Sequence, residues 1–257
     1  MKHERAMKRR QFLKGTAGIA SLCALAGCDK LTQSNWFPSI LSQTENLTDR
    51  VQRAITPANA LAKEYGDADI SKVFPSNGNT DPGTAAYAEH VAKNFSEWTV
   101  EVGGLVQSPM SWSLAALKEL PSRTQITRHD CVEGWSAIGK WTGVPLGDLM
   151  HKVQPLPNAK FAVFHCADVD EDAVPYYESM ALVDCYHPQT IMAYELNGTP
   201  LDIPHGAPIR LRFERQLGYK QAKYVTKIEL VETLSDIAGG KGGYWEDDQG
   251  YEWYAGI

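Results

Sequence analysis

Residues 128–136 read Arg-His-Asp-Cys-Val-Glu-Gly-Trp-Ser, and Cys131 in this stretch is the strongest indication of fold and chemistry in the chain. Beside Arg128 and His129, a cysteine can be held as a thiolate. A thiolate is the protein ligand that soft metal ions prefer. A metal-ligand loop at Cys131 is therefore the first expectation.

Short strands and helices surround this loop along the chain. Residues 125–128 are expected as a strand that delivers the Cys131 loop, and Asn197-Gly198 is the strongest hairpin signal. The other expected elements are strands at 98–102, 160–165, 191–196, 201–203, 209–213 and 224–231, a helix at 113–120 capped by Ser113 and stopped by Pro121, and a helix at 145–151. Because strands and short helices mix without a regular βαβ period, the pattern predicts an α+β domain over residues 72–257.

The first 27 residues have the order of an export signal. Arg9-Arg10 begins a twin-arginine motif, and the apolar stretch 16–26 is too short for an ordinary membrane span. It ends in Leu-Ala-Gly-Cys, which resembles a lipobox, so we expect Cys28 to be acylated as the first mature residue. Asp29 then favours retention at the periplasmic side of the inner membrane. A plain amphipathic helix at the N-terminus is the alternative.

The segment after the signal is expected to be a polar tether. Residues 28–71 are rich in Ser, Thr, Gln and Asn, with a helix expected at 58–65. Six of the 25 Lys and Arg and one of the 31 Asp and Glu lie in residues 1–27, which leaves 19 basic and 30 acidic residues, a formal charge of about −11. This charge argues against nucleic acid as a partner and favours solubility.

Cysteines are sparse and do not form paired metal-binding motifs. Without the signal and Cys28, the chain retains Cys131, Cys166 and Cys185, of which the last two could pair in an exported protein. Their spacing contains no CxxC pair for structural zinc and no CxxCH for covalent haem. A redox enzyme of this composition must exchange electrons through another protein.

A basic segment lies in the second half of this acidic chain. Between His205 and Lys223 the charged residues are Arg210, Arg212, Arg215, Lys220 and Lys223 against Glu214 alone. An arginine fork with lysine and backbone amides is suited to a phosphate, so we expect an anion site here. A solvated strand face with alternating charges is the alternative.

The ordered set of motifs from residue 74 onward resembles the sulfite-oxidase-like molybdopterin-dependent oxidoreductases, including their methionine-sulfoxide-reducing and sulfite-dehydrogenase branches. The set comprises residues 74–80, 98–106, the Cys131 loop, 141–146, 193–201, 205–210, 218–223, 243–246 and 250–254. The resemblance implies an α+β molybdopterin-binding domain of mixed sheets and short helices that receives its cofactor before export. The aromatic tail, which contains Trp245, Tyr251, Trp253 and Tyr254, is expected to cover the core.

Carried over residue by residue, the resemblance makes Cys131 the molybdenum ligand. The cofactor contacts that it implies are Asn77, Thr80, Asp81, Cys166, His205, Arg210, Gln221, Ala222 and Lys223. Two positions depart from the methionine-sulfoxide-reducing branch: Cys166 replaces a threonine, and His205 replaces an asparagine and is closer to the sulfite oxidases proper. Cys185 is expected in the core.

The activity that the resemblance implies is two-electron oxygen-atom transfer on a small oxyanion or sulfoxide. Arg128 and His129 are expected to hold substrate beside Cys131, with Arg215 as a second candidate. Electrons would pass to or from an external cytochrome or membrane haem protein. The chain carries no added dimerisation domain, which favours a monomer, and the direction of the reaction stays open.

Two readings of a different class remain at this point. The chain could be a membrane-tethered, non-catalytic binding lipoprotein that keeps the fold without the metal. Cys131 could also be a thiol nucleophile paired with a distant histidine, although no hydrolase motif surrounds it.

Overall fold

The structure is a computed structural model that describes residues 51, 52, 54, 56, 57 and 59–257. The chain divides into two units, Met1–Val51 and Gln52–Ile257, and every element named below lies in the second. The expected twin-arginine motif, Cys28 and the tether up to residue 50 lie outside the described residues.

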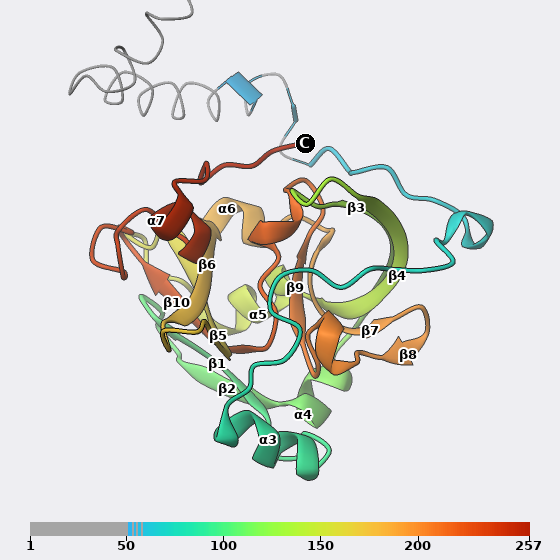
Figure 1. Cartoon of the computed structure of the whole chain (residues 1–257). Coiled ribbons are helices and arrows are strands. Elements are labelled where there is room, and N and C mark those ends of the chain that lie inside the picture. The colour runs from blue at the N-terminus through green and yellow to red at the C-terminus, as the bar shows by residue number, and fades with distance from the viewer. Residues whose placement is uncertain (1–50, 53, 55, 58) are drawn as a thin grey trace, which may run out of the picture. The chain divides into compact units, whose positions relative to one another are not determined.

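Two five-stranded sheets form the second unit (Figure 1). The first has the order β2-β1-β10-β5-β6, with β1 parallel to β10 and the other neighbours antiparallel. The second has the order β3-β4-β7-β8, and β9 also pairs with β7, along Thr190 to Ala193. The strands are β1 (Thr99–Gly104), β2 (Met110–Ser113), β3 (Arg123–Asp130), β4 (Ser136–Pro145), β5 (Phe161–Val169), β6 (Pro175–Ala181), β7 (Thr190–Leu196), β8 (Thr199–Pro200), β9 (Arg210–Phe213) and β10 (Val225–Val231).

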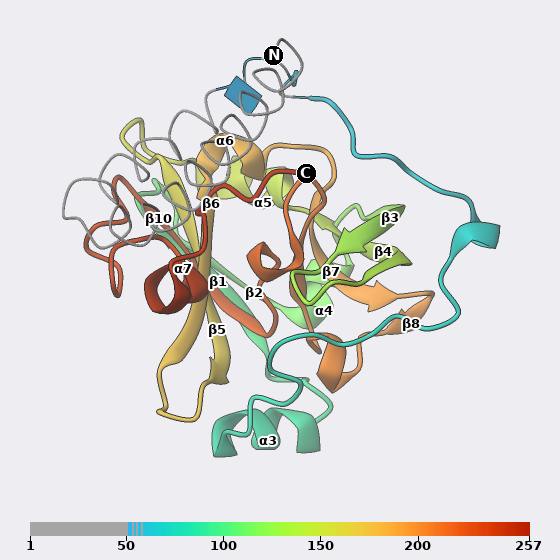
Figure 2. The same cartoon turned by 45° about the horizontal axis from the view of Figure 1, so that its top comes forward.

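The described helices are short and lie around the sheets, as the rotated view makes clear (Figure 2). They are η1 (Asp67–Asp69), α3 (Ala85–Ala92), α4 (Leu114–Lys118), α5 (Leu146–Val153), α6 (Leu182–Cys185), η2 (Ile203–His205), η3 (Gly218–Lys220) and α7 (Tyr244–Gln249). Within the described ranges, none of them has the length and apolar character needed to cross a membrane. Mixed sheets with few helices confirm the α+β class.

The main core joins the two sheets. Val102 of β1 and Ile228 of β10 belong to one buried cluster with Val144 of β4 and Met192 of β7. Cys185 lies in the same cluster and is fully buried, as expected. Burying side chains of this size contributes roughly 1.5–3 kcal/mol each, so the core gives the loops above it a rigid base.

Most expected elements are present, often longer than the pattern indicated. The helix at 113–120 is α4, with Ser113 accepting a hydrogen bond from the Ala116 amide as its N-cap. The Asn197-Gly198 hairpin joins β7 to β8, but its second strand is Thr199–Pro200, and the strand expected at 201–203 is wrong. Cys166 and Cys185 are free thiols, so the pairing considered from the sequence does not occur.

The end of the segment expected to be a tether lies along the second sheet. The helix expected at 58–65 is wrong, because residues 59–65 contain no helix and Glu64 pairs with Thr127 of β3. The Tyr65 amide donates to the Ile126 carbonyl, and the Ser71 amide donates to the Ile138 carbonyl. Backbone pairing with an existing strand therefore outweighs the local helix preference.

Strand β5 contains an irregularity that matters for the site. Its pairing with β6 shifts register between His165 and Val169, and its pairing with β10 shifts between Val225 and Lys227. A bulge of this kind redirects the side chains of the extra residues. Asp168 lies within this irregular stretch and lines the cavity described next.

Candidate active site

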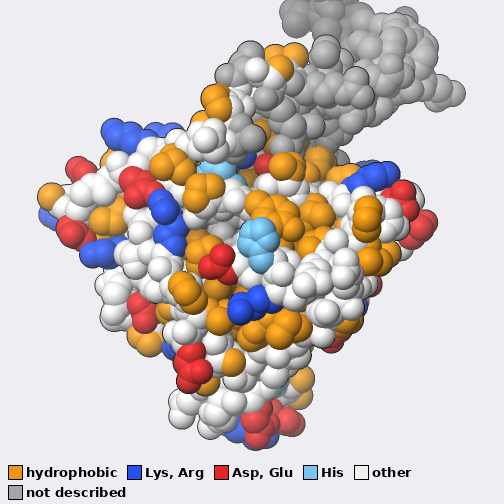
Figure 3. All heavy atoms as spheres, turned by 180° about the vertical axis from the view of Figure 1, so that it is seen from behind, with side chains coloured by type: hydrophobic (Ala, Val, Ile, Leu, Met, Phe, Trp, Pro, Cys, Tyr) orange, Lys and Arg blue, Asp and Glu red, His pale blue; other side chains and the backbone are white. Residues whose placement is uncertain are grey.

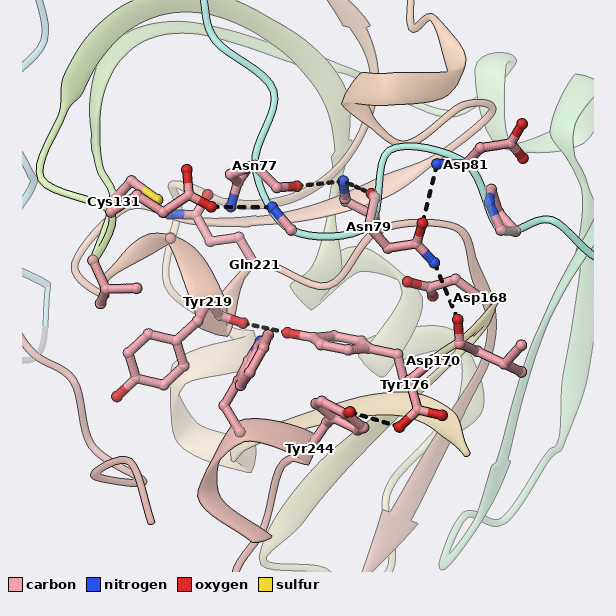
Figure 4. A pocket seen from close by; sticks show the side chains of 18 of the residues that line it. Asn77, Asn79, Asp81, Cys131, Asp168, Asp170, Tyr176, Tyr219, Gln221 and Tyr244 are labelled. Carbon is pink, nitrogen blue, oxygen red and sulfur yellow. Dashed lines mark hydrogen bonds between the residues drawn. The ribbon is translucent and has the colours of Figure 1, made fainter. Parts of the chain in front are cut away.

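A cavity of about 660 Å³ opens between loops from both sheets (Figure 4). Its lining comes from five separate stretches of the chain and one β6 residue: Asn77, Gly78, Asn79, Asp81, Pro82 and Gly83; Cys131, Val132 and Glu133; Asp168, Val169, Asp170 and Glu171; Gly218, Tyr219, Gln221 and Lys223; Tyr244, Trp245 and Tyr251; and Tyr176. The volume is within the range of about 300–1,000 Å³ that is usual for ligand and cofactor pockets.

Cys131 reaches this cavity from a tight loop at the end of β3. The Cys131 amide donates to the Trp135 carbonyl at 2.9 Å, and the Gly134 amide donates to the Cys131 carbonyl at 3.1 Å. Gly134 has a φ of 89°, a conformation that glycine adopts without strain. The loop thus holds a free thiol, 8% exposed, at the cavity wall.

The charge state of Cys131 differs from the sequence expectation. Burial raises the pKa of its thiol, and the nearby Glu133 carboxylate raises it further. Neighbouring side chains therefore do not hold a thiolate here. A bound metal cation would, because coordination removes the thiol proton. Among the described residues, no group of three or more His, Cys, Asp or Glu is arranged to hold a metal ion.

Arg128 and His129 do not line the cavity, contrary to the role expected for them. Strand alternation in β3 puts Arg128 on the exposed face, where its Nε donates to Asp130 Oδ2 at 2.9 Å. His129 faces inward, is fully buried and accepts from Arg212 Nη1 at 2.8 Å on its Nδ1. Burial and the Arg212 charge lower the pKa of His129 well below its usual value, so it is neutral. Its ring packs on Trp135 and supports the loop.

Most of the expected basic segment is paired inside the protein. Arg212 bonds Glu214 at 2.6 Å, Arg215 bonds Asp184 at 3.3 Å, and Lys220 bonds Glu178 at 2.5 Å and also Glu246. Arg212 and Lys220 are almost fully buried, so the alternative of a solvated strand face is wrong. Arg215 likewise points to Asp184 and lies outside the cavity lining.

Lys223 and Arg210 differ from the other three cations. Lys223 Nζ donates to the carbonyls of Asn77, at 2.7 Å, Asn79 and Pro204. Arg210 donates to the carbonyls of His205, at 3.0 Å, and Gln221, at 3.1 Å. Within the described part of the chain, neither has a carboxylate partner at ion-pair distance.

Both cations are buried at an electrostatic cost. Burial and the Arg210 charge lower the pKa of Lys223 to about 7, while burial and Arg212 lower the pKa of Arg210 to about 9. A Cβ on Gly206 would lie 3.0 Å from Lys223 and 3.2 Å from Arg210, so glycine is what lets the two side chains approach. An anion beside Lys223 would relieve this excess of positive charge.

The other expected cofactor contacts fall into two groups. Asn77, Asp81 and Gln221 line the cavity together with Lys223 and Cys131. Outside the lining are Thr80, which is exposed, Cys166, which is partly buried, Ala222, which is buried, and Arg210 and His205. His205 uses both ring nitrogens, bonding the Phe74 carbonyl at 2.9 Å and Asp202 at 2.5 Å.

Asp168, Asp170 and Tyr176 line the cavity but were not assigned to the site from the sequence. Asp168 is 3% exposed, and burial raises the pKa of its carboxyl to about 6. In Figure 4, Asp168 and Asp170 lie across the cavity from Cys131 and Gln221. The tail residues Trp245 and Tyr251, expected to cover the core, line the cavity instead. The acidic run 168–172 and the aromatic residues of the tail are the signals that could have indicated this wall.

Comparison with known proteins gives a consistent set of relatives. The family model "Oxidoreductase molybdopterin binding domain" matches residues 88–237. A protein of Azospira oryzae, named provisionally as the protein-methionine-sulfoxide reductase subunit YedZ1, is 35% identical over 96% of this chain and 87% of its own length. The protein-methionine-sulfoxide reductase catalytic subunit MsrP of Xanthomonas axonopodis is 36% identical over 68% of this chain, which spans 54% of that relative.

Among solved structures, the sulfane dehydrogenase SoxCD from Paracoccus pantotrophus matches with a TM-score of 0.48 and 20% identity. The match covers 54% of this chain and 39% of that one.

Proposed function

Because this chain belongs to the family of oxidoreductases with a molybdopterin-binding domain, we propose that it reduces methionine sulfoxide in polypeptides, with molybdenum bound at Cys131. The observation that carries the proposal is that Cys131 and Lys223 line one cavity of about 660 Å³. The names of two relatives, both protein-methionine-sulfoxide reductase subunits, support the substrate and the reductive direction.

The residues of the cavity fit a molybdenum-pterin group. Cys131 offers one soft ligand, and Lys223, an ammonium bonded only to carbonyls among the described residues, offers a charge for a phosphate. The side-chain amides of Asn77, Asn79 and Gln221 offer further hydrogen bonds. Arg210, behind Lys223, adds positive potential without direct access to the cavity.

When bound, the cofactor supplies two-electron redox chemistry that moves an oxygen atom. In the net reaction the sulfoxide takes up two electrons and two protons, and it leaves as a thioether and water. The protein's part is to bind and orient the methionyl side chain. The aromatic rings of Tyr176, Tyr219 and Trp245 can hold its sulfur and methyl group and exclude water from the metal side.

Electrons for the reaction would come from a separate redox protein, a cytochrome or a membrane haem protein. The words "subunit" and "catalytic subunit" in the relatives' names support such a partner. We also propose twin-arginine export, a periplasmic location and a lipid anchor at Cys28. Labelled fatty acid should enter the wild type and not Cys28→Ala, and equal labelling would contradict the anchor.

The test of the proposed function is metal content together with activity. Protein purified from a molybdenum-competent host should carry about one molybdenum per chain and oxidise a reduced dye when methionine sulfoxide is added. Cys131→Ala should lose both properties and keep its circular dichroism. The matched control is Cys185→Ala, which removes a thiol from the core and should retain both. A wild-type protein without metal would favour the non-catalytic binding lipoprotein. Oxidation of sulfite without reduction of sulfoxide would contradict the proposed reductive direction.

A further inference from the structure

The charged groups that line the cavity are mostly acidic. They are Asp81, Glu133, Asp168, Asp170 and Glu171, against Lys223 as the one basic residue of the lining. On the face of the molecule seen in Figure 3, acidic and basic side chains are interspersed instead. One lysine cannot offset five carboxylates, so the lining as a whole is acidic.

None of these five carboxylates forms an ion pair with a lysine or arginine of the described chain. Asp170 accepts a hydrogen bond from the Tyr244 hydroxyl at 2.6 Å, and Glu133 accepts one from Trp135 Nε1 at 3.0 Å. Asp168 is the decisive member, because its Oδ1 is buried with no hydrogen-bond partner in the described residues and it faces the cavity. A buried, unpaired carboxylate oxygen calls for a donor or a cation from a ligand.

Aromatic rings form another part of the lining and reach Asp170 through the Tyr244 hydroxyl. Trp245 and Tyr251 are stacked with ring centroids 5.9 Å apart, and Tyr219 meets Tyr251 edge-on at 5.0 Å. Tyr176 and Tyr244 lie 5.5 Å apart in the same wall. Aromatic faces next to carboxylates attract lysine and arginine side chains by cation–π and Coulomb interactions together.

We infer that the cavity is selective for methionine sulfoxide flanked by lysine or arginine in the substrate polypeptide. The flanking cation lies against the Trp245–Tyr251 wall with Glu171 as its carboxylate partner, and Asp168 adds to the negative potential of the lining. This inference rests on the proposed function and specifies its substrate class.

The experiment compares three short peptides with the cofactor-loaded enzyme. Each has one central methionine sulfoxide, flanked on both sides by two lysines, two glutamines or two glutamates. Binding is followed by calorimetry and turnover by oxidation of a reduced dye. Affinity and kcat/KM should fall in the order lysine, glutamine, glutamate. Added salt should weaken binding of the lysine peptide and leave binding of the glutamine peptide unchanged, because salt screens exposed charges.

Replacing one carboxylate with a neutral amide tests which residue causes the preference for lysine. Glu171→Gln should lower the lysine-to-glutamine ratio of kcat/KM by about two- to five-fold, as expected for one partly exposed charge pair. The matched control is Glu119→Gln, an exposed glutamate at the end of α4 outside the cavity lining. It should leave the ratio unchanged.

The outcomes separate the two claims. The inferred selectivity would be overturned, and the proposed function kept, if turnover were intact but the three peptides bound equally or the glutamate peptide bound best. Binding in the expected order with no reduction of any peptide would contradict the proposed function and leave the selectivity standing. A ratio unchanged in Glu171→Gln would also overturn the assignment of that carboxylate.

Discussion

Lys223 and Asp168 are buried, ionisable side chains on the wall of one cavity, and burial makes the ionised form of each less favourable. Burial lowers the pKa of Lys223 to about 7 and raises that of Asp168 to about 6, although each residue's charge opposes the shift of the other. They are not hydrogen-bonded to one another, because Lys223 donates to carbonyls. The cavity therefore keeps two polar groups available for ligands at the expense of stability.

Substituting Asp168 should reveal this cost as a function of pH. The pKa of its carboxyl is raised from 3.8 to about 6, so the folded state binds a proton more tightly than the unfolded state. Its contribution to stability is thus present below pH 4 and is lost as pH rises through 6. Cofactor-free Asp168→Asn should be more stable than wild type at pH 7.5 by roughly 1–3 kcal/mol, and about equal at pH 4. Urea unfolding at the two pH values measures this.

The control for that substitution is Asp236→Asn at an exposed position, which should change stability little at either pH. If Asp168→Asn were less stable than wild type at pH 7.5, the carboxylate would have to be a structural hydrogen-bond acceptor and not an unpaired one.

At the scale of elements, a buried ion triad joins η3, β6 and α7. Lys220 bonds Glu178 of β6 at 2.5 Å and also Glu246 of α7, with all three side chains at most 1% exposed. Burial raises the pKa of Glu178 well above its usual value. This favours one proton shared between the Glu178 and Glu246 carboxyl groups, which both contact the Lys220 ammonium. This triad fixes the helix that carries Trp245 and Tyr244 at the cavity.

Removing the cation of the triad should be costly. Lys220→Met would leave two buried carboxylates without their partner and should lower the free energy of unfolding by about 3–5 kcal/mol. Lys160→Met is the control, because the pair between Lys160 and Glu232 is exposed and should contribute less than about 1 kcal/mol. Chemical unfolding with both variants tests this. Similar small losses would mean that the triad is not what holds α7.

At the scale of the whole molecule, the cavity collects stretches that are far apart in the chain. Its lining includes residues from the stretches 77–83, 131–133, 168–171, 218–223 and 244–251. Lys223 already links the first of these to the fourth through its bonds to Asn77 and Asn79. A ligand that bonds several of these stretches at once binds the folded state alone and stabilises it.

Loss of the cofactor should therefore lower the melting temperature of the whole domain. For a ligand at about 1,000 times its dissociation constant, the stabilisation is about 4 kcal/mol. Calorimetry of loaded and cofactor-free protein measures the difference in melting temperature. This difference should be smaller in Lys223→Met, because the phosphate of the cofactor loses its ammonium partner. Lys227→Met, at a partly exposed position of β10 paired with Glu229, is the matched control. Equal melting temperatures with and without cofactor would contradict the prediction.

Much of the secondary structure follows from local signals. Alternation predicted β1, the Asn197-Gly198 pair predicted a hairpin after β7, and Ser113 predicted the start of α4. Strand β4 was missed because Gly139, Lys140 and Gly143 interrupt its apolar pattern. Gly143 is required by contact: a Cβ there would lie 2.2 Å from the Met192 carbonyl oxygen on β7. Such a close approach cannot be read from neighbours in the sequence.

The sequence by itself determined the Cys131 loop, the Lys223 region and the family, because these depend on residue types in a fixed order. Only the tertiary structure decided which charges are available. Arg212, Arg215 and Lys220 have the same chemistry as Lys223 in the sequence, but Glu214, Asp184 and Glu178 neutralise them. The fold likewise placed Asp168, in the irregular stretch of β5, on the cavity wall. Charge pairing and strand register act between residues distant in the chain, so they appear only when the chain is folded.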